Sequence, residues 1–128
     1  MLLTGIDLVE IPRIENSLKR ESFLKRVMGR EELEEYRLSG SKAQRVAACF
    51  AAKEAFGKSL GTGLNAFSLT EVQLLHEDSG KPYFFLTGKA KKLIEKNKIE
   101  LSVSITHTDK YAAAVVVGYS PNERLCLK

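Results

Sequence analysis

The stretch FAAKEAFGKSLGTG, residues 50–63, predicts the second half of a long helix that ends in a glycine-rich turn. The same pattern extends back toward the N-terminus, so we expect one helix from about residue 43 to residue 60. With about 100° between successive residues, its apolar side chains fall on one side, and we expect that side to pack against a sheet. These side chains are Val46, Cys49, Ala52, Phe56 and Leu60.

The segments around this helix predict strands and shorter helices. Residues 2–11 are apolar and β-branched, as expected for a strand, and Pro12 suits the first turn of a following helix. We expect helical structure over residues 13–37 with a break at Gly29, and Ser41 as the N-cap of the long helix. The remaining predicted elements are strands at 67–76, 83–86, 101–106 and 111–119 and a helix at 88–97.

This order of elements predicts the fold class. A strand, helices, a β-hairpin, a helix and a second hairpin indicate an α+β fold, with a mostly antiparallel sheet packed against the long central helix. The chain has no repeat and no linker, so residues 1–128 are expected to form a single domain. We expect the last strand to be buried and the tail after about residue 120 to be loose.

Composition indicates a soluble globular protein. Hydrophobic residues are 44% of the chain and charged residues 28%, and no apolar run reaches the length of a transmembrane helix. The N-terminus lacks the basic and then apolar pattern of a signal peptide. Cys49 and Cys126 lie far apart and match no metal-binding spacing, so we expect reduced thiols. We therefore predict a cytoplasmic protein without a membrane partner.

Positive charge is concentrated near the N-terminus. The net charge is +4, and residues 13–30 contain six basic and two acidic side chains. Such a surface can meet an acidic protein, a nucleic acid or only water. A nucleic acid is the less favoured partner, because the segment lacks interleaved aromatic residues and matches no common nucleic-acid-binding motif.

Glu54 and Lys58 are the first candidates for chemistry. They are four residues apart, so their side chains meet on one face of the helix, where we expect Ala47 and Ala51 to leave open space. A Glu–Lys pair on a helix surface is common and contributes only about 0.3–0.5 kcal/mol, so the pair alone does not indicate function. Lys53 falls near the apolar side, and we expect its ammonium group to extend out to water.

The turn Gly61-Thr62-Gly63 has two alternative roles. Its backbone N–H groups can bind phosphate oxygens, or the glycines can simply cap the helix. The C-terminal end of a helix disfavours an anion, so a phosphate at this place needs Lys58 or a bound cation.

Asp7 interrupts an otherwise apolar strand. A carboxylate in such a place faces water at the strand end, accepts backbone hydrogen bonds or binds a metal ion. If Asp7 lies next to Glu54, the two acids form an oxygen-donor site that suits Mg²⁺, which usually takes one or two carboxylates together with waters and substrate phosphates. His107 stands at the end of a strand, where a lone histidine is more often structural than catalytic, and no nucleophile motif is present.

Three separate segments together show a family resemblance. GIDLVEI (5–11), FAAKEAFGKSLGTG (50–63) and SVSITHT (102–108) resemble the bacterial holo-[acyl-carrier-protein] synthase family within the 4′-phosphopantetheinyl transferase superfamily. The likeness also includes DSGKPYF (78–84) and YAAAVVV (111–117), so it covers almost the whole chain. Each motif is modest alone, and the match depends on their order and spacing.

The resemblance implies an activity and an assembly. Enzymes of this family transfer the phosphopantetheine arm of coenzyme A to a serine of apo acyl carrier protein and release adenosine 3′,5′-bisphosphate. They are homotrimers, with sheets packed around a threefold axis and sites at the subunit interfaces.

The resemblance also implies site residues. Asp7 and Glu54 match the Mg²⁺ ligands, and Lys58 matches a lysine near the transferred phosphate. His107, with Thr108 beside it, matches a histidine that lines the coenzyme A site. The bound nucleotide is expected beside Gly61, Thr62 and Gly63.

General chemistry adds roles to these residues. Mg²⁺ on a pyrophosphate neutralises the leaving group, and a serine hydroxyl needs a base, for which Glu54 and a water held by the metal are the candidates. Lys58 is expected to stabilise or protonate the departing phosphate. The basic N-terminal helical region is expected to dock the acidic acyl carrier protein through Arg13, Arg20 and Arg26.

One position departs from the family pattern. Many members have arginine before the FAAKEA phenylalanine, where this chain has Cys49. Arg45 lies one helical turn earlier on the same face, and we expect it to make the phosphate contact instead.

Two other functions are the alternatives: a non-catalytic subunit that binds coenzyme A or a nucleotide, and a basic α+β module that binds RNA. Asp7, Glu54 and Lys58 argue against both, because a binding module needs no such combination of two acids and a lysine.

Overall fold

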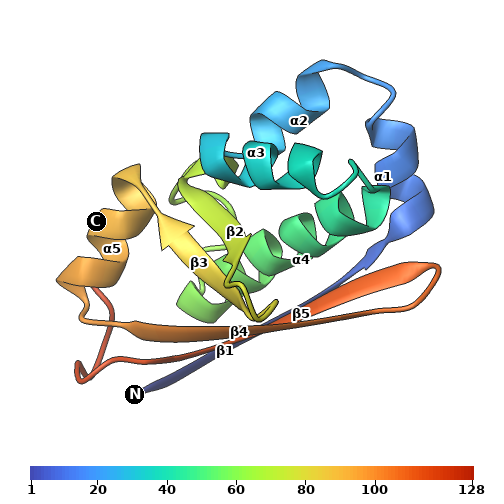
Figure 1. Cartoon of the computed structure of the whole chain (residues 1–128). Coiled ribbons are helices and arrows are strands. Elements are labelled where there is room, and N and C mark those ends of the chain that lie inside the picture. Colours follow the sequence, from blue (N-terminus) through green and yellow to red (C-terminus); the bar gives the residue numbers. More distant parts are fainter.

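The first and last strands of the chain are neighbours in the main sheet. The computed structural model describes residues 1–128, and its three-stranded antiparallel sheet has the order β1 (Leu2–Glu10), β5 (Tyr111–Tyr119), β4 (Glu100–His107). In β1 the odd-numbered residues face the helices and the even-numbered residues face away, as their alternating burial shows. All helices lie on one side of this sheet (Figure 1), which confirms the predicted α+β fold.

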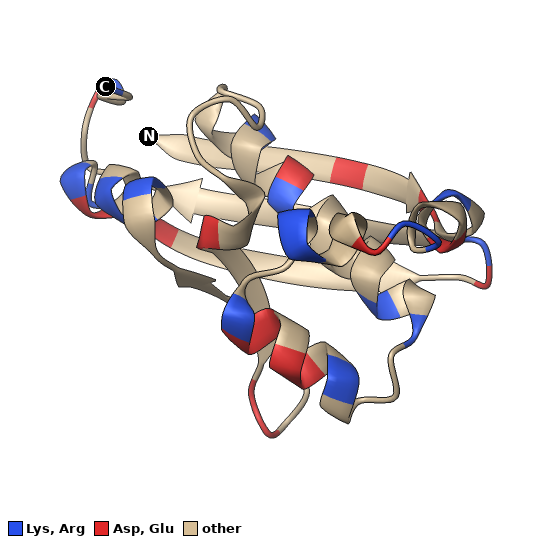
Figure 2. Cartoon of the chain, turned by 90° about the horizontal axis from the view of Figure 1, so that it is seen from above, with Lys and Arg blue, Asp and Glu red and all other residues tan.

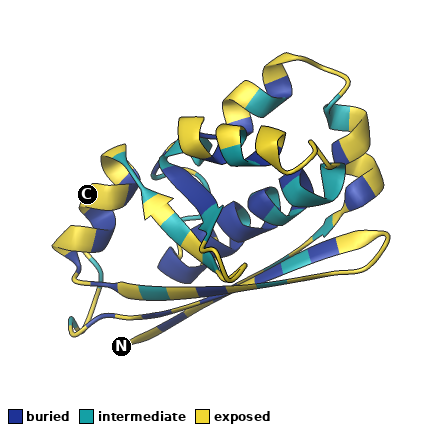
Figure 3. Cartoon of the chain, viewed as in Figure 1, coloured by how far each residue is buried: buried dark blue, intermediate teal, exposed yellow.

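The predicted long helix is confirmed as α4 (Ala43–Leu60), which packs against β1 and β5. Its apolar face is buried as expected, and Figure 3 shows that most of the helix is buried. Gly5 allows this close packing, because a Cβ atom there would overlap the carbonyl oxygen of Ala55. Ala47 and Ala51 were expected to border open space, but both are completely buried because α4 is enclosed on several sides.

Three helices, not two, follow β1: α1 (Ile11–Ser17), α2 (Ser22–Val27) and α3 (Arg30–Leu38). The predicted break at Gly29 is confirmed, whereas the break at residues 18–21 was missed. Ile14 and Phe23 are both buried in the core. A continuous helix would place these two side chains about 180° apart, so the chain has to turn between them.

The prediction that Ser41 caps α4 is wrong. Ser41 has a φ of 55°, and Lys42 occupies the N-cap position without a capping side-chain hydrogen bond. Gly40 also has a positive φ, because the chain turns sharply between α3 and α4.

The first hairpin forms a sheet of its own, with β2 (Val72–His76) paired to β3 (Pro82–Leu86). β2 begins later than predicted, because the preceding residues form a short 3₁₀ helix, η1 (Leu69–Glu71). Glu71 caps that turn by accepting a hydrogen bond from the backbone N–H of Ser68. The next helix, α5 (Gly88–Lys96), is confirmed, and its buried side chains are Ala90, Leu93 and Ile94.

No element of the chain covers one face of the main sheet (Figures 1 and 3), and this face is largely apolar along β1 and β5. β5 was predicted to be buried, but only alternate residues are, since Tyr119 is 50% exposed and Val117 is 45% exposed. Leu2 pairs with Tyr119 and Ile6 pairs with Val115 across the two strands, so the exposed side chains are continuous. This surface, called the β1–β5 strip below, contains Leu2, Ile6, Leu8, Val115, Val117 and Tyr119.

The tail after residue 120 has no helix or strand but is bound to the end of α5. Asn97 accepts a hydrogen bond from the N–H of Cys126 at 2.7 Å and donates one to its carbonyl at 2.9 Å. We still predict that the rest of the tail is loosely held. Both cysteines are free thiols. No helix combines the length and the apolar character that crossing a membrane requires.

Candidate active site

Asp7 and Glu54, the two acids expected to meet, line the same cavity. Asp7 is an odd-numbered residue of β1 and therefore faces the helices, where α4 carries Glu54. This cavity, called the carboxylate cavity below, has a volume of about 590 Å³, and Lys58 and Arg13 also line it. The packing of α4 on β1 thus brings the three predicted catalytic residues together.

Lys58 forms its ion pair with Asp7, not with Glu54. Its Nζ donates hydrogen bonds to Asp7 Oδ1 at 3.1 Å and to the carbonyl oxygen of Ile6 at 3.0 Å. Glu54 and Lys58 do share this face of the helix, but the lysine pairs with Asp7 because it extends across to the strand, where two acceptors are available. The Lys58 side chain is 52% exposed, so it is accessible to a ligand.

The pKa of the Glu54 carboxyl is raised above its usual range. Burial is the main cause and the negative charge of Asp7 is the second, while Lys58 acts in the opposite direction. The two carboxylates therefore disfavour each other's charge, and a cation bound between them would relieve this repulsion.

The two carboxylates fit the requirements of Mg²⁺. The structure contains no group of three or more His, Cys, Asp or Glu side chains placed to hold a metal ion. Two carboxylates are nevertheless sufficient for Mg²⁺, which completes its coordination with waters and substrate phosphates. The oxygen donors of Asp7 and Glu54 and the unfavourable charge at Glu54 both suit this ion.

The glycine-rich turn after α4 is a helix cap. Gly61 has a φ of 75°, and the N–H groups of Gly61, Thr62 and Gly63 donate to the carbonyls of Lys58 and Gly57. The alternative in which these N–H groups bind phosphate is therefore wrong, since each already has an acceptor. The turn stays a predicted neighbour of the nucleotide, although it does not line the carboxylate cavity.

Arg45 and His107 line a second cavity, called the Arg45 cavity below. Its volume is about 410 Å³, and Lys42 and His76 also line it. The separation of Arg45 and Glu54 in sequence corresponds to about 180° around the axis of α4 and about 13 Å along it. The two cavities therefore lie on opposite sides of the helix, and they have no residue in common.

Thr108 and Cys49 have structural roles in this chain. Thr108 Oγ1 accepts hydrogen bonds from the N–H groups of Lys110 and Tyr111 and so stabilises the turn between β4 and β5. Cys49 is buried, and this burial raises the pKa of its thiol well above the usual range. An uncharged buried thiol cannot replace the arginine that many family members have at this place.

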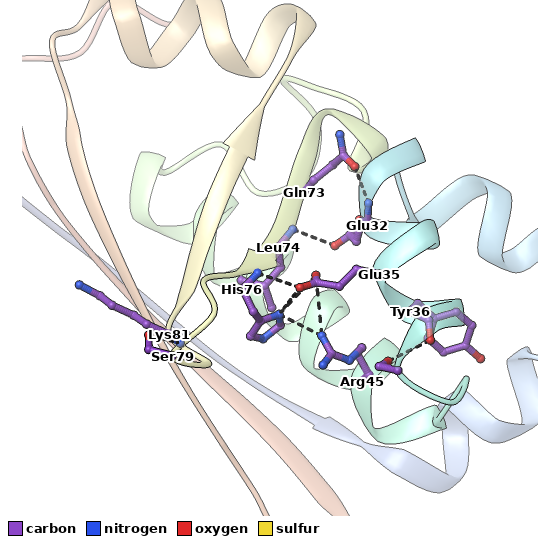
Figure 4. Close-up of polar contacts among 10 residues, drawn as sticks. Glu32, Glu35, Tyr36, Arg45, Gln73, Leu74, His76, Ser79 and Lys81 are labelled. Atoms are coloured by element: carbon purple, nitrogen blue, oxygen red, sulfur yellow. Dashed lines mark hydrogen bonds and ion pairs between the residues drawn. The ribbon is translucent and has the colours of Figure 1, made fainter.

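A buried charged cluster surrounds Lys53 and was not predicted from the sequence. This side chain does not extend to water; its Nζ donates to Glu32 Oε1 at 2.7 Å and to the carbonyls of Leu69 and Val72. Glu32 in turn accepts a hydrogen bond from the N–H of Leu74 at 2.9 Å (Figure 4). The signal in the sequence was the place of Lys53 on the apolar side of the helix, where a charge needs a buried partner.

The three arginines expected to bind the carrier protein are all exposed. Arg13 on α1 also lines the carboxylate cavity, Arg20 precedes α2, and Arg26 lies within α2. Figure 2 shows charged residues mainly on helices and loops, and the three strands of the main sheet contain no Lys or Arg. The basic surface therefore reaches the carboxylate cavity and is separate from the β1–β5 strip.

Comparison with known proteins identifies the family. A model described as the 4′-phosphopantetheinyl transferase superfamily matches residues 4–116. The holo-[acyl-carrier-protein] synthase of Treponema denticola is 43% identical over 116 residues, which are 88% of this chain and 94% of that protein.

Solved structures of similar proteins give the same result. The crystal structure of the Neisseria meningitidis holo-[acyl-carrier-protein] synthase is similar with a TM-score of 0.86 and 34% identity, over 92% of this chain and 98% of that one. The Helicobacter pylori synthase, solved in complex with coenzyme A, has a TM-score of 0.80 and 31% identity, over 91% of this chain and 100% of that one. Because the family model matches residues 4–116 and the similar synthases cover most of the sequence, this chain belongs to the 4′-phosphopantetheinyl transferase superfamily.

Proposed function

We propose that this chain transfers the 4′-phosphopantetheine group of coenzyme A to a serine of an apo acyl carrier protein in the cytoplasm. The products are holo acyl carrier protein and adenosine 3′,5′-bisphosphate. Membership of the family and the similarity to holo-[acyl-carrier-protein] synthases support this proposal. The observation that carries it is the presence of Asp7, Glu54 and Lys58 in one cavity.

Each of these side chains has a role in the proposed reaction. Asp7 and Glu54 would hold Mg²⁺, which neutralises charge on the pyrophosphate of coenzyme A when it is bound. Glu54 accepts the proton of the serine hydroxyl, directly or through a water, as the serine oxygen forms its bond to phosphorus. The bond from that phosphorus to the adenosine 3′,5′-bisphosphate oxygen breaks, and Lys58 donates a hydrogen bond or a proton to the leaving phosphate.

A direct assay tests the proposal. The chain is incubated with coenzyme A, Mg²⁺ and an apo acyl carrier protein, and the mass of the carrier is measured. We expect an increase by one phosphopantetheine group that depends on Mg²⁺. Failure to modify several apo carriers would contradict the proposal. Binding of coenzyme A without transfer would then favour a non-catalytic subunit, and binding of RNA would favour an RNA-binding module.

The basic surface on α1 and α2 is proposed to dock the acidic carrier protein. We expect Arg20→Glu to raise the KM for the carrier about fivefold or more at low salt, and less at high salt, because attraction between exposed charges is screened. The KM for coenzyme A should not change. Lys92→Glu, an exposed charge reversal on α5, is the control and should change neither constant. A change only in the KM for coenzyme A would place the docking surface elsewhere.

We also propose that the complete site forms between two copies of the chain in a homotrimer. The carboxylate cavity and the Arg45 cavity lie on opposite sides of α4, so one coenzyme A molecule is not expected to reach both within a single chain. The β1–β5 strip offers an apolar surface through which copies can pack. The proposed contacts of coenzyme A are Lys58, Gly61, Thr62 and Gly63 together with Arg45, His107 and Thr108.

Two impaired variants are expected to restore activity when they are co-expressed. Glu54→Gln removes a carboxylate from one side of each site, and Arg45→Ala removes the cation from the other side. In trimers that assemble at random, about a quarter of the sites combine Glu54 of one copy with Arg45 of another. At a limiting concentration of coenzyme A, the mixture should therefore exceed the average rate of the separate variants several-fold.

The matched control for this experiment is a mixture of Glu54→Gln with Asp7→Asn. Both changes lie in the same cavity, so no copy has an intact pair of carboxylates and no recovery is expected. If the mixture of Glu54→Gln with Arg45→Ala shows only the average of the separate rates, the site does not extend between copies.

A further inference from the structure

His76 and Glu35 hold the guanidinium of Arg45 in place (Figure 4). Arg45 Nη1 lies 2.9 Å from His76 Nδ1 and 3.7 Å from Glu35 Oε2. Because a guanidinium can only donate, His76 Nδ1 accepts this hydrogen bond and carries no proton. The other guanidinium nitrogens form no hydrogen bond within the chain and remain available to a ligand.

Glu35 also fixes the backbone at the histidine. Its Oε1 accepts a hydrogen bond from the backbone N–H of His76 at 3.0 Å, while its Oε2 attracts the guanidinium of Arg45 and not the unprotonated Nδ1 of His76. The three residues come from α3, from α4 and from the end of β2. Only 22% to 29% of each side chain is exposed, so the cluster is held between three packed elements.

The Arg45 cavity is suited to an anion. Its lining includes Lys42, Arg45, His76 and His107 and contains no acidic residue. Glu35 contacts Arg45 without lining the cavity. The carboxylate therefore orients the guanidinium without placing a negative charge directly beside a bound anion.

We propose that His76 and Glu35 are positioning residues for coenzyme A: they hold Arg45 so that its free nitrogens bind a phosphate group of that substrate. This inference rests on the proposed function. An arginine side chain has several rotatable bonds, and fixing it before the ligand arrives reduces the entropy that is lost on binding. The cluster thereby supplies the phosphate contact that Cys49 cannot make.

A comparison of His76→Leu with His76→Asn in the transfer assay tests this role. Leucine removes the acceptor, whereas asparagine places its side-chain oxygen near the position of Nδ1. We expect His76→Leu to raise the KM for coenzyme A about five- to tenfold, with kcat changed less than about twofold and the KM for the carrier unchanged. His76→Asn should keep the KM for coenzyme A within about twofold of the wild-type value.

The control is Glu77→Gln, an exposed neighbour of His76 that does not line the Arg45 cavity and should change neither constant. An unchanged KM for coenzyme A in His76→Leu would overturn the proposal. An equal increase in His76→Asn and His76→Leu would also overturn it, because the acceptor would then have no part in the effect.

Calorimetric titration with coenzyme A separates this proposal from the proposed function. If the wild-type chain binds coenzyme A but transfers nothing, the proposed function fails. The role of His76 is then decided by the Kd for coenzyme A, which should rise in His76→Leu and stay close to the wild-type value in His76→Asn. If the wild-type chain does not bind coenzyme A, both proposals fail.

Titration with 3′-dephospho-coenzyme A identifies the phosphate. If Arg45 binds the 3′-phosphate, the weakening caused by His76→Leu is present with coenzyme A and disappears with the dephospho compound. If Arg45 binds the pyrophosphate, the weakening is the same with both compounds. No weakening with either compound overturns the proposal.

Discussion

Glu54→Gln is expected to lower the transfer rate about a thousandfold or more while the fold stays intact. Glutamine keeps the size of the side chain but removes the charge that helps to hold Mg²⁺ and the acceptor for the serine proton. Asp7→Asn should have a similar effect, because it removes the second carboxylate of the same cavity. The measurement is the initial rate of carrier modification over a titration of Mg²⁺.

Glu95→Gln is the matched control for this loss. Glu95 lies on α5 with 66% of its side chain exposed, and its replacement should leave the rate unchanged. A wild-type rate for Glu54→Gln or Asp7→Asn at limiting Mg²⁺ would show that the metal assignment is wrong.

The same Glu54→Gln substitution is expected to stabilise the metal-free protein at neutral pH. Burial and Asp7 raise the pKa of Glu54 above its ordinary value of 4.5, so the folded chain binds this proton more tightly than the unfolded chain does. Between the ordinary and the raised pKa, the stability of the wild-type chain therefore falls as the pH rises. The stability of the Glu54→Gln variant does not fall in this way, because glutamine has no carboxyl group to ionise.

Thermal unfolding in EDTA over a range of pH measures this effect. The Tm of Glu54→Gln should exceed the wild-type Tm at pH values above the raised pKa and approach it at pH values below 4.5, where Glu54 is protonated in both states. A lower Tm for the variant at neutral pH would mean that the ionised carboxylate stabilises the fold, contrary to its raised pKa.

Lys53→Met is expected to lower the free energy of unfolding by about 3–5 kcal/mol. Lys53 is fully buried, and its removal leaves the carboxylate of Glu32 buried without its cation. It also leaves the carbonyl groups of Leu69 and Val72 without the donor that they have now. Urea unfolding measures the loss, and a loss below about 1 kcal/mol would contradict this account.

A double variant tests whether the hydrogen bonds between the buried ion pair and the backbone also stabilise the fold. Lys53→Met with Glu32→Leu removes both charges, a replacement that is neutral or stabilising in some proteins. Here the N–H of Leu74 also loses its acceptor, so we expect the double variant to remain destabilised by about 2 kcal/mol or more. Lys91→Met removes an exposed ion pair with Glu95 and should change the free energy by less than about 0.5 kcal/mol.

Most elements of the fold followed from local patterns. The apolar spacing of α4 and the alternation in β4 depend on residues only a few positions apart, so they can be recognised in a single sequence. The prediction was wrong at residues 18–21 and at Ser41, where the chain turns so that the short helices can bury Ile14, Phe23 and Tyr36 in the core that α4 shares. Those turns depend on contacts with distant segments, which override local preference.

The candidate site likewise has features that the sequence predicts and features that depend on distant contacts. The residue types of the site can be recognised in the sequence: an acid in an apolar strand, and a glutamate and a lysine one turn apart on a helix before a glycine cap. The folded chain was needed to show that Asp7 and Glu54 share a cavity, that Lys58 bonds to Asp7, and that His76 and Glu35 hold Arg45. These contacts join segments far apart in the chain. They depend on the placement of α4 against β1, α3 and the hairpin, which results from packing the whole core and not from the preferences of neighbouring residues.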